Sequence, residues 1–446
     1  MTHKYASIVF LILVCIFAAV GCGSGKTANG AASTTATPSD SASGQLEFVY
    51  VLGTGGQLAG YSIGAQGSLS PIPGSPWQIP DTPNQILRDG NVLLFTTSGE
   101  YTANGYTFLD PTEQKVLSYT IDPNDGSLTP AASVALNEDG TSRIAQWATT
   151  NSSGTLLYAS TPYDPTNFSD PTSATAAINE LAIFRVGQDG TLAAVPGSPF
   201  PPGSCDWFGI PPAFTPDDTL LFRISGTGGP CDTHPDFSYY SVEGFSVLPD
   251  GTLGSYVASL GLPTLADGET TGGSSVKLTP SGALLIVLDP GDGLFKTYSV
   301  NPQSSLPVTG SGSSSLASGV LTFIGAFPFP TTNTYVQYMG KPQMDATGRF
   351  LLFSSEAGSL GIYSIKSDGS IVAVAGSPFP VNLVPTELYA FSTTSKYALA
   401  VDANNNLLAF VVDASTGALS PVSSVTLPSE PQGGLYTWRT LIAGGR

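Results

Sequence analysis

The sequence predicts an all-β protein, and within that class a seven-bladed β-propeller. A short turn of the type Asp-Gly-Ser/Thr-Leu recurs seven times, and each copy follows a short strand that carries an aromatic residue near its end. Short strands joined by Asp-Gly and Ser-Gly turns are typical of β-hairpins, and sheets of four such strands repeated around a centre make a propeller. A β-sandwich is the alternative, but it does not require a sevenfold turn.

The seven copies of the turn mark the third and fourth strands of each blade. Their spacing runs from 48 to 65 residues, which leaves room for substantial loops, and they end at Leu69, Leu128, Leu192, Leu253, Leu306, Ile371 and Leu419. Upstream of most copies lies another strand after a Gly or Asp turn, as in PSGALLIVL and ATGRFLLFS.

The two ends of the repeat region predict how the first blade is completed. The first repeat, from Phe48, lacks a strand before its glycine-rich turn, whereas the last repeat is followed by an extra strand, LYTWRTLIAG, at 435–444. We expect this C-terminal strand to join the first blade and leave no exposed sheet edge there.

A second short phrase recurs three times, as PGSPW at 73–77, PGSPF at 196–200 and AGSPF at 375–379. It contains no nucleophile–base pair and no metal-ligand cluster. We interpret it as a structural turn after the fourth strand, in which proline fixes the backbone and the aromatic residue packs between neighbouring blades.

The N-terminal region is predicted to be a signal peptide followed by a tether. Lys4 precedes an apolar run that ends in Ala19-Val20-Gly21-Cys22, and this ending resembles the lipobox of bacterial lipoproteins. The resemblance implies lipidation of Cys22, with Gly23 favouring the outer membrane. An ordinary secretory signal and an uncleaved anchor remain alternatives. We therefore divide the chain into a signal peptide (1–21), a flexible Gly/Ala/Ser/Thr tether (22–45) and the propeller (46–446).

The charge balance excludes some classes of partner. Removing residues 1–21 takes away Lys4 and leaves 14 of the 15 basic side chains against 33 acidic ones, a net charge of about −19. Binding to nucleic acid and attachment to anionic lipid by charge both need a cluster of basic side chains. The strongly negative net charge therefore excludes both. The lipid anchor is thus the expected membrane partner, in the cell envelope, on either the periplasmic or the surface face.

The blade GRFLLFSSEAGSLGIYSIKSDGSIVAVAGSPF and the opening FVYVLGTGG resemble the lactonase-type seven-bladed propellers, including the related YVTN-type repeats. The similarity covers essentially all of residues 46–446. It implies hydrolysis of 6-phosphogluconolactone or muconate-type lactones, with His, Arg and Glu on inner strands facing a central channel. This chain has two histidines, His3 in the signal and His234 in a loop, so a carboxylate would have to replace histidine as the general base.

The candidate site residues lie on the predicted inner strands. Arg143 and Lys277 are candidates for holding an anionic or carbonyl group, and Glu387 is the candidate base. Gln85, Trp147, Gln343 and Trp438 are candidate ligand-binding residues. Further polar or aromatic members of these strands are Gln146, Trp207, Lys341 and Arg439.

Cysteines and acidic turns complete the list of candidates. Cys205 and Cys231 are expected to pair in an exported domain, and a thiol nucleophile near His234 is the alternative. The acidic turns at 122–126, 163–172 and 289–293 contain possible Ca²⁺ ligands, but none has the spacing of an EF-hand loop, so we predict no metal site and no cofactor.

Two function classes follow from these observations. The protein is either a lipid-anchored binding or scaffolding propeller for a small molecule, carbohydrate or protein partner, or an exported lactone hydrolase. The missing channel histidine and the exported compartment, in which cytoplasmic 6-phosphogluconolactone is not expected, favour the first class, and the resemblance favours the second.

Overall fold

The structure of the protein is a computed structural model. The chain divides into two compact units, Met1–Ala42 and Ser43–Arg446. The structure describes residues 46–81, 83–97, 99–103, 106–110, 114–136, 145, 147–161, 180–200, 211–225, 241–261, 275–289, 293–301, 320–329, 342–354, 358–383, 388–431 and 441–444. Every core cluster among these residues is built from the second unit alone, so this unit carries its own hydrophobic core. The predicted signal peptide and tether lie outside the described residues.

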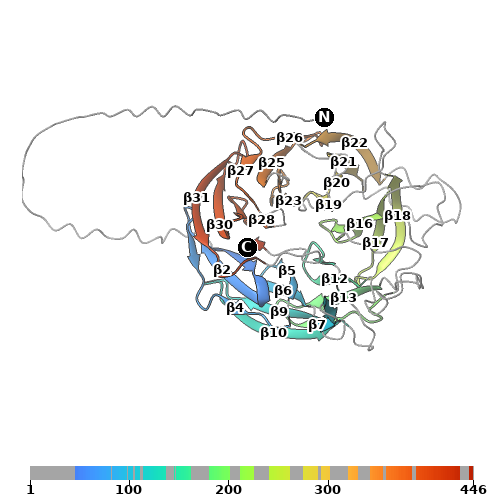
Figure 1. The fold of residues 1–446 in the computed structure, drawn as a ribbon. Helices are drawn as coiled ribbons and strands as arrows, with labels where there is room; N and C mark the ends of the chain where they lie inside the picture. Colours follow the sequence, from blue (N-terminus) through green and yellow to red (C-terminus); the bar gives the residue numbers. More distant parts are fainter. Residues whose placement is uncertain are drawn as a thin grey trace, which may run out of the picture. The chain divides into compact units, whose positions relative to one another are not determined.

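The second unit is a seven-bladed β-propeller (Figure 1). Blade 1 contains β32 (Leu441–Gly444), β1 (Glu47–Leu52), β2 (Gln57–Ile63), β3 (Leu69–Pro71) and β4 (Trp77–Gln78), with a 3₁₀ turn η1 (Thr54–Gly56). Blade 2 contains β5 (Pro83–Asp89), β6 (Val92–Thr97), β9 (Lys115–Ile121) and β10 (Leu128–Ala135), beside an added hairpin, β7 (Gly99–Ala103) and β8 (Tyr106–Asp110). Blade 3 contains β11 (Trp147–Thr150), β12 (Leu156–Thr161), β13 (Glu180–Val186) and β14 (Leu192–Ala194).

The remaining four blades follow in chain order. Blade 4 contains β15 (Ala213–Phe214), β16 (Leu220–Ser225), β17 (Ser241–Val247) and β18 (Leu253–Gly261). Blade 5 contains β19 (Ser275–Leu278), β20 (Leu284–Asp289), β21 (Leu294–Val300) and β22 (Leu321–Pro328). Blade 6 contains β23 (Gln343–Met344), β24 (Phe350–Ser354), β25 (Ser359–Ile365), β26 (Ile371–Ala373) and β27 (Phe379–Pro380). Blade 7 contains β28 (Tyr389–Phe391), β29 (Tyr397–Val401), β30 (Asn406–Val412) and β31 (Leu419–Thr426).

The first strands of the blades are the innermost ones. Contacts join β5 to β11, β15 to β19, β23 to β28 and β28 to β32, so first strands of neighbouring blades meet around the centre (Figure 1). The sequence assigned these strands correctly. The predicted pairing between the C-terminal strand and the first blade is present, because β32 runs antiparallel to β1 with Val49 opposite Ala443.

Apolar side chains fill the seams between neighbouring blades. Each of seven buried clusters combines residues of two adjacent blades, such as Val49 with Leu399 between blades 1 and 7, and Phe48 with Phe95 between blades 1 and 2. Both faces of each sheet are therefore buried, as expected for strands that are rich in Val, Leu, Ile and aromatic residues and poor in charge.

The recurrent turn locks each blade onto the one before it. Its glycine adopts a positive φ, +79° at Gly126 and +78° at Gly417, which favours glycine. A Cβ on Gly126 would lie 2.6 Å from a ring carbon of Phe48 in the preceding blade. The carbonyl of Gly126 accepts a 2.7 Å hydrogen bond from the Tyr50 hydroxyl. The copy that ends at Leu306 lies outside the described residues.

The Gly-Ser-Pro phrase interrupts the fourth strand of blades 1, 3 and 6. Its serine hydroxyl accepts a backbone N–H of the third strand: Ser75 from Gly60 at 2.8 Å, Ser198 from Ile183 at 2.8 Å and Ser377 from Ile362 at 2.9 Å. The following aromatic residue then pairs with the same third strand: Trp77 with Leu58, Phe200 with Leu181 and Phe379 with Leu360. Each aromatic side chain packs against a core cluster between two blades, so the structural interpretation of the phrase is confirmed.

The other four blades lack this phrase and have a long fourth strand instead. Their fourth strands, β10, β18, β22 and β31, are eight or nine residues long and contain a register shift against the third strand. An extra residue in one strand bends the sheet edge, as a β-bulge does. The phrase is thus present in the blades whose fourth strand is short.

Candidate functional site

A pocket of about 170 Å³ opens between the first strands of blades 3, 4 and 5. It lies where three inner strands meet and is lined by Thr149, Thr150, Ser152, Pro211, Pro212, Ala213, Phe214, Ser275, Val276, Lys277 and Leu278. Its walls thus combine hydroxyl groups, proline and other apolar groups, and one lysine. This mixture of apolar wall and a few polar groups is typical of small-molecule sites.

Local turn chemistry fixes where each pocket-lining strand ends. The first residue of each following turn has a side-chain oxygen that accepts the backbone N–H five residues later. The pairs are Asn151 with Leu156 at 2.9 Å, Thr215 with Leu220 at 3.0 Å and Thr279 with Leu284 at 3.1 Å. Side chains of Asn and Thr stabilise turns through such bonds.

Asp218 joins two of these turns at the edge of the pocket. Its carboxylate accepts the backbone N–H groups of Ser152 at 2.6 Å and Ser153 at 3.1 Å and the amide of Asn151 at 2.9 Å. The Ser152 hydroxyl donates in return to the Thr215 carbonyl at 2.9 Å. Blades 3 and 4 are therefore tied together directly beside the pocket, which preorganises its wall.

A buried ion pair stands behind the pocket wall in blade 4. Arg223 of β16 places Nε 2.9 Å and Nη2 2.8 Å from Glu243 Oε2 on β17. The guanidinium also lies over the Phe245 ring, 5.2 Å from its centre. Arg223 directly follows Phe222, whose strand partner is the pocket residue Ala213.

A second buried ion pair occupies the corresponding region of blade 5. Lys296 Nζ lies 2.7 Å from Asp289 Oδ2, and the two side chains are 3% and 0% exposed. Asp289 follows Leu288, whose strand partner is the pocket residue Ser275. Both side chains face the seam between blades 4 and 5, so the two pairs flank blade 4 on either side.

Tyr298 lies in the same seam as the second pair. Burial raises the pKa of its phenol well above the usual value, and the negative charge of Asp289 raises it further. Its hydroxyl is buried without a hydrogen-bond partner. The phenol therefore stays protonated and neutral at physiological pH.

Of the predicted catalytic residues, Lys277 lines the pocket. It lies on β19 opposite Ile286 and is partly buried. Arg143 and Glu387 lie outside the described residues, as does Trp438, so their convergence with Lys277 stays a prediction. Gln146, Trp207, Lys341 and Arg439 lie outside them as well.

The structure places Gln85 and Trp147 in the protein core. Gln85 of β5 donates its amide to the Ala148 carbonyl and accepts the Ala148 N–H, both at 2.8 Å, and thereby links blades 2 and 3. Trp147 is fully buried among Tyr158, Phe214 and their neighbours. Gln343 is partly buried on β23 opposite Leu352.

Thr149, Thr150 and Ser275 line the pocket but were not among the predicted candidates. Their signal was present in the sequence, because Thr149 and Ser275 fall inside the predicted inner strands TSRIAQWAT and SSVKLTP. The predicted candidates were large or charged side chains, so these small hydroxyl-bearing residues were not among them.

Several other predictions concern residues away from the pocket. Cys205, Cys231 and His234 lie outside the described residues, and so does the acidic segment 163–172. In the turn at 122–126, Asp122 accepts the Asn124 N–H at 2.8 Å and Asp125 accepts the Ser127 N–H at 2.8 Å. Within the described ranges no group of three or more His, Cys, Asp or Glu side chains could hold a metal ion, and no helix is long and apolar enough to cross a membrane.

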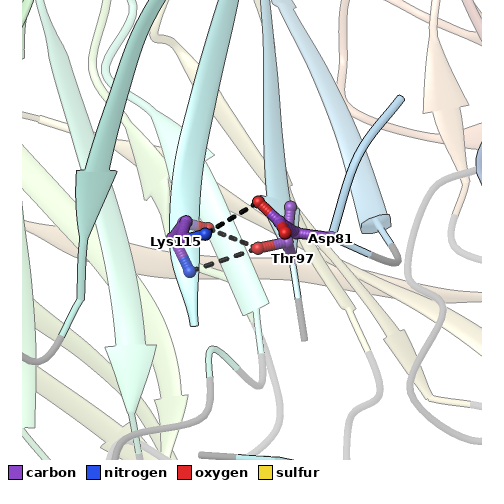
Figure 2. Close-up of polar contacts among 3 residues, drawn as sticks. All are labelled: Asp81, Thr97 and Lys115. Atoms are coloured by element: carbon purple, nitrogen blue, oxygen red, sulfur yellow. Dashed lines mark hydrogen bonds and ion pairs between the residues drawn. The ribbon is translucent and has the colours of Figure 1, made fainter. Parts of the chain in front are cut away.

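Another partly buried cation, Lys115, is held in a local network of blade 2 (Figure 2). Its Nζ lies 2.9 Å from Asp81 Oδ2, and its backbone N–H donates to the Thr97 hydroxyl at 3.2 Å. Asp81 belongs to the segment between β4 and β5, so this pair links blade 2 to the segment that connects it with blade 1. At about one-third exposure for both side chains, we expect it to contribute little to stability.

Solved structures with the same architecture come from several bacteria. A Bacteroides fragilis protein provisionally assigned as a 6-phosphogluconolactonase superposes with a TM-score of 0.59, 15% identity and coverage of 88% of this chain and 98% of that one. The fold is that of a lactonase-like propeller. The Pseudomonas aeruginosa periplasmic gluconolactonase gives a TM-score of 0.58, 17% identity and coverage of 87% and 98%. A Lactobacillus plantarum protein gives 0.58, 12%, 87% and 98%.

Comparison with known protein families finds no match, and no curated protein matches the chain. At these identities the structural likeness defines the fold, and the activity has to be argued from the site.

Proposed function

We propose that this lactonase-like propeller binds a small carboxylate- or lactone-bearing molecule in the pocket between blades 3, 4 and 5. The observation that carries the proposal is the position of Lys277 on that pocket, beside the hydroxyl-bearing residues Thr149, Thr150 and Ser275. An ammonium group attracts a carboxylate or a polarised carbonyl oxygen, and hydroxyl groups both donate and accept hydrogen bonds. This combination suits a sugar acid or its lactone.

The size of the pocket supports a ligand of one ring. Its volume is about 170 Å³. An apolar cavity of roughly 150 Å³ holds a molecule the size of benzene, so a single five- or six-membered lactone or a short sugar acid matches this space.

The strongly negative net charge of the protein makes the position of Lys277 significant for anion binding. The chain has 15 basic and 33 acidic side chains, so an anion is repelled by most of the surface. Lys277 is the basic residue that lines the pocket, and Arg223 and Lys296 form buried ion pairs in blades 4 and 5. Recognition of an anion in this protein therefore depends on local placement of positive charge.

Calorimetric titration of residues 43–446 with gluconate, and with neutral glucose as the matched ligand, tests the proposal. We expect gluconate to bind more tightly than glucose, and Lys277→Met to abolish that preference. Lys366→Met is the matched control, because it removes one exposed lysine in blade 6, away from the pocket. Equal binding of gluconate by wild type and Lys277→Met would contradict the proposal.

Lactone hydrolysis is the second candidate function, and it is supported by the likeness to the Pseudomonas aeruginosa periplasmic gluconolactonase. Water attacks the lactone carbonyl, the ring C–O bond breaks with its oxygen taking up a proton, and a hydroxy carboxylate and a proton are released. Lys277 would stabilise the negative charge that develops on the carbonyl oxygen. Arg143 is proposed to assist it, and Glu387 is proposed as the base that takes the proton from water.

Proton release in a pH-stat measures this reaction directly. Residues 43–446 are assayed against glucono-δ-lactone, 6-phosphogluconolactone and an aliphatic lactone, with Arg143→Ala, Lys277→Ala and Glu387→Gln as variants. If the protein is a hydrolase, its rate of proton release exceeds the spontaneous rate, and Glu387→Gln removes that excess. A rate equal to the spontaneous one on every lactone eliminates hydrolysis and leaves the binding function to the calorimetric test.

We also propose that the protein acts in the bacterial cell envelope, attached through a lipid on Cys22. The support is the sequence Ala19-Val20-Gly21-Cys22 followed by a Gly/Ala/Ser/Thr segment. Metabolic labelling with an alkyne fatty acid should mark the wild-type chain but not Cys22→Ala, with Ser24→Ala as the control. Equal label in Cys22→Ala would refute the anchor.

A further inference from the structure

The turns between the first and second strands of blades 3 to 7 share one backbone conformation. In each turn the N–H of the fourth residue donates to the carbonyl of the first, as Gly282 donates to Thr279 at 2.7 Å in blade 5. In blades 3, 5 and 6 the fourth residue is a glycine with positive φ, +72° at Gly154 and Gly282 and +70° at Gly348. Glycine adopts this conformation more readily than any other residue.

Blades 4 and 7 have a residue with a side chain at this fourth position. Asp218 has a φ of +56° and Ser395 a φ of +60°. The Asp218 carboxylate accepts the N–H of Ser152, the second turn residue of the preceding blade, at 2.6 Å. The Ser395 hydroxyl likewise accepts the N–H of Ala346, the second turn residue of blade 6, at 2.7 Å. A serine is therefore sufficient to link two blades at this position, and the carboxylate of Asp218 adds a negative charge that the link does not require.

The Asp218 carboxylate is bound by a group of N–H donors next to the pocket. It accepts the backbone N–H groups of the consecutive residues Ser152 and Ser153, and the side-chain amide of Asn151 at 2.9 Å. Consecutive backbone N–H groups that converge in this way form an anion-binding site, and here the protein itself supplies the anion. Because Ser152 also lines the pocket, the negative charge of Asp218 lies one hydrogen bond away from the pocket wall.

The charges around the pocket are positive on one side and negative on the other. Among the described residues of the pocket-lining strands and the turns that follow them, the charged ones are Lys277 in blade 5 and Asp217 and Asp218 in blade 4. Asp218 reaches back to Ser152 in blade 3. The first strand of blade 4 thus separates the Lys277 side of the pocket from the side bordered by the Asp218 carboxylate.

We propose, building on the sugar-acid binding proposed above, that Asp218 restricts the pocket to ligands with a single anionic group. The carboxyl carbon and the terminal hydroxymethyl carbon are the two ends of a six-carbon sugar acid. A carboxylate at Lys277 therefore directs the other end toward blades 3 and 4. A phosphoryl group on that end would be repelled by Asp218 and would find the Ser152 and Ser153 N–H groups already engaged. The ligand class is an unphosphorylated sugar acid or its lactone.

An uncharged hydroxyl group at the same end can still be bound. The two oxygens of a carboxylate offer about four acceptor sites, and the Asp218 carboxylate accepts three N–H groups from blade 3. A ligand hydroxyl can donate to the remaining site, whereas a phosphate has only negative oxygens to present. Asp218 is partly buried, so its charge is screened less than that of a fully exposed carboxylate.

Calorimetric titration of residues 43–446 with gluconate and with 6-phosphogluconate, in one low-salt buffer, tests this selectivity. Asp218→Ser is the test variant, because Ser395 already makes the same link between blades 6 and 7. Asp368→Ser is the matched control, because it removes one carboxylate from a turn of blade 6 and leaves the pocket-lining blades unchanged.

We expect wild type to bind gluconate at least about threefold more tightly than 6-phosphogluconate. In Asp218→Ser the affinity for 6-phosphogluconate should rise at least about threefold, while the affinity for gluconate should change less than about twofold. Asp368→Ser should bind both ligands as wild type does. Equal binding of the two ligands by wild type would overturn the proposal. An unchanged ratio of affinities in Asp218→Ser, or the same shift in Asp368→Ser, would overturn it as well.

The role of Asp218 and the binding function can fail separately. Gluconate binding that is weakened by Lys277→Met, together with equally tight binding of 6-phosphogluconate, would retain the pocket and refute the role of Asp218. Failure of gluconate to bind at all would refute both. If Asp218→Ser lowers Tm, Asp218→Asn is the second variant, because asparagine keeps a side-chain oxygen and tolerates positive φ. It should show the same gain in affinity for 6-phosphogluconate, and the absence of that gain would overturn the proposal.

Discussion

Replacing Lys296 with methionine removes the ammonium group that lies 2.7 Å from Asp289 Oδ2 in the seam between blades 4 and 5. The Asp289 side chain is fully buried, so water cannot take the place of the lost cation without opening the seam. Methionine keeps most of the length of the side chain, and the substitution therefore tests the charge more than the packing.

The expected loss of stability follows from this burial. Removing one partner of a buried ion pair costs about 3–5 kcal/mol. A unit of about 400 residues has an unfolding entropy near 0.85 kcal/mol per kelvin, which converts this loss into a Tm decrease of about 4–6 °C. Differential scanning calorimetry of residues 43–446 measures it.

Two further variants separate the charge from other effects. Lys366→Met, which removes an exposed lysine of the same length, should change Tm by less than about 1 °C. Asp289→Leu combined with Lys296→Met should recover much of the loss, because no buried charge is left alone. The reasoning is refuted if Lys296→Met melts within about 1 °C of wild type, or if the double variant is less stable than the single one.

Three other predictions address the repeated turns. Gly417→Ala should lower the free energy of unfolding by about 1–3 kcal/mol, which is more than Gly55→Ala should. Both glycines have positive φ, but an added Cβ would meet other atoms only at Gly417. Equal effects of the two substitutions in chemical denaturation would contradict the role of the turn in locking blades. Hydrogen bonds from neighbouring Ser and Thr groups hold the pKa of Asp413 well below its usual range. The contribution of this carboxylate to stability is therefore present above the pKa of the unfolded state and is lost as pH falls through the folded-state pKa. Asp413→Asn should flatten the decline of Tm between about pH 4 and pH 2, and an unchanged slope would refute this prediction. Ser377→Ala removes the acceptor of the Ile362 N–H and should cost about 1–2 kcal/mol with the fold retained, as judged by circular dichroism and urea unfolding; a neutral result would show that the hydroxyl is dispensable.

The fold could be predicted from the sequence because its main determinants are local. The recurrent turn needs glycine at a position such as Gly126, where φ is +79° and the preceding blade leaves no room for a Cβ. That requirement is visible as a repeated letter pattern. The same holds for Ser75, whose hydroxyl has a defined backbone partner within the same blade.

The candidate site was predictable only in part. The predicted site residues were chosen among the charged, polar and aromatic members of the inner strands. In a propeller, however, both faces of an inner strand pack against neighbouring blades, and mainly the strand edge borders the centre. Trp147 and Gln85 are therefore buried between blades, whereas the small residues Thr149 and Ser275 border the pocket.

The buried ion pairs depend on long-range pairing and could not be predicted from local patterns. Arg223 and Glu243 are 20 positions apart and stand within otherwise apolar strands. The sequence shows only that each strand contains one charged residue. Which two charges meet is decided by the register of β16 against β17, where Arg223 lies directly opposite Glu243.

Binding of gluconate in the pocket can be observed directly in a crystal structure of residues 43–446 soaked in gluconate. We expect difference density for one sugar acid between the inner strands of blades 3, 4 and 5, with its carboxylate within hydrogen-bond distance of Lys277 Nζ. Gluconate bound elsewhere on the propeller, with this pocket filled by water, would contradict the proposed binding site.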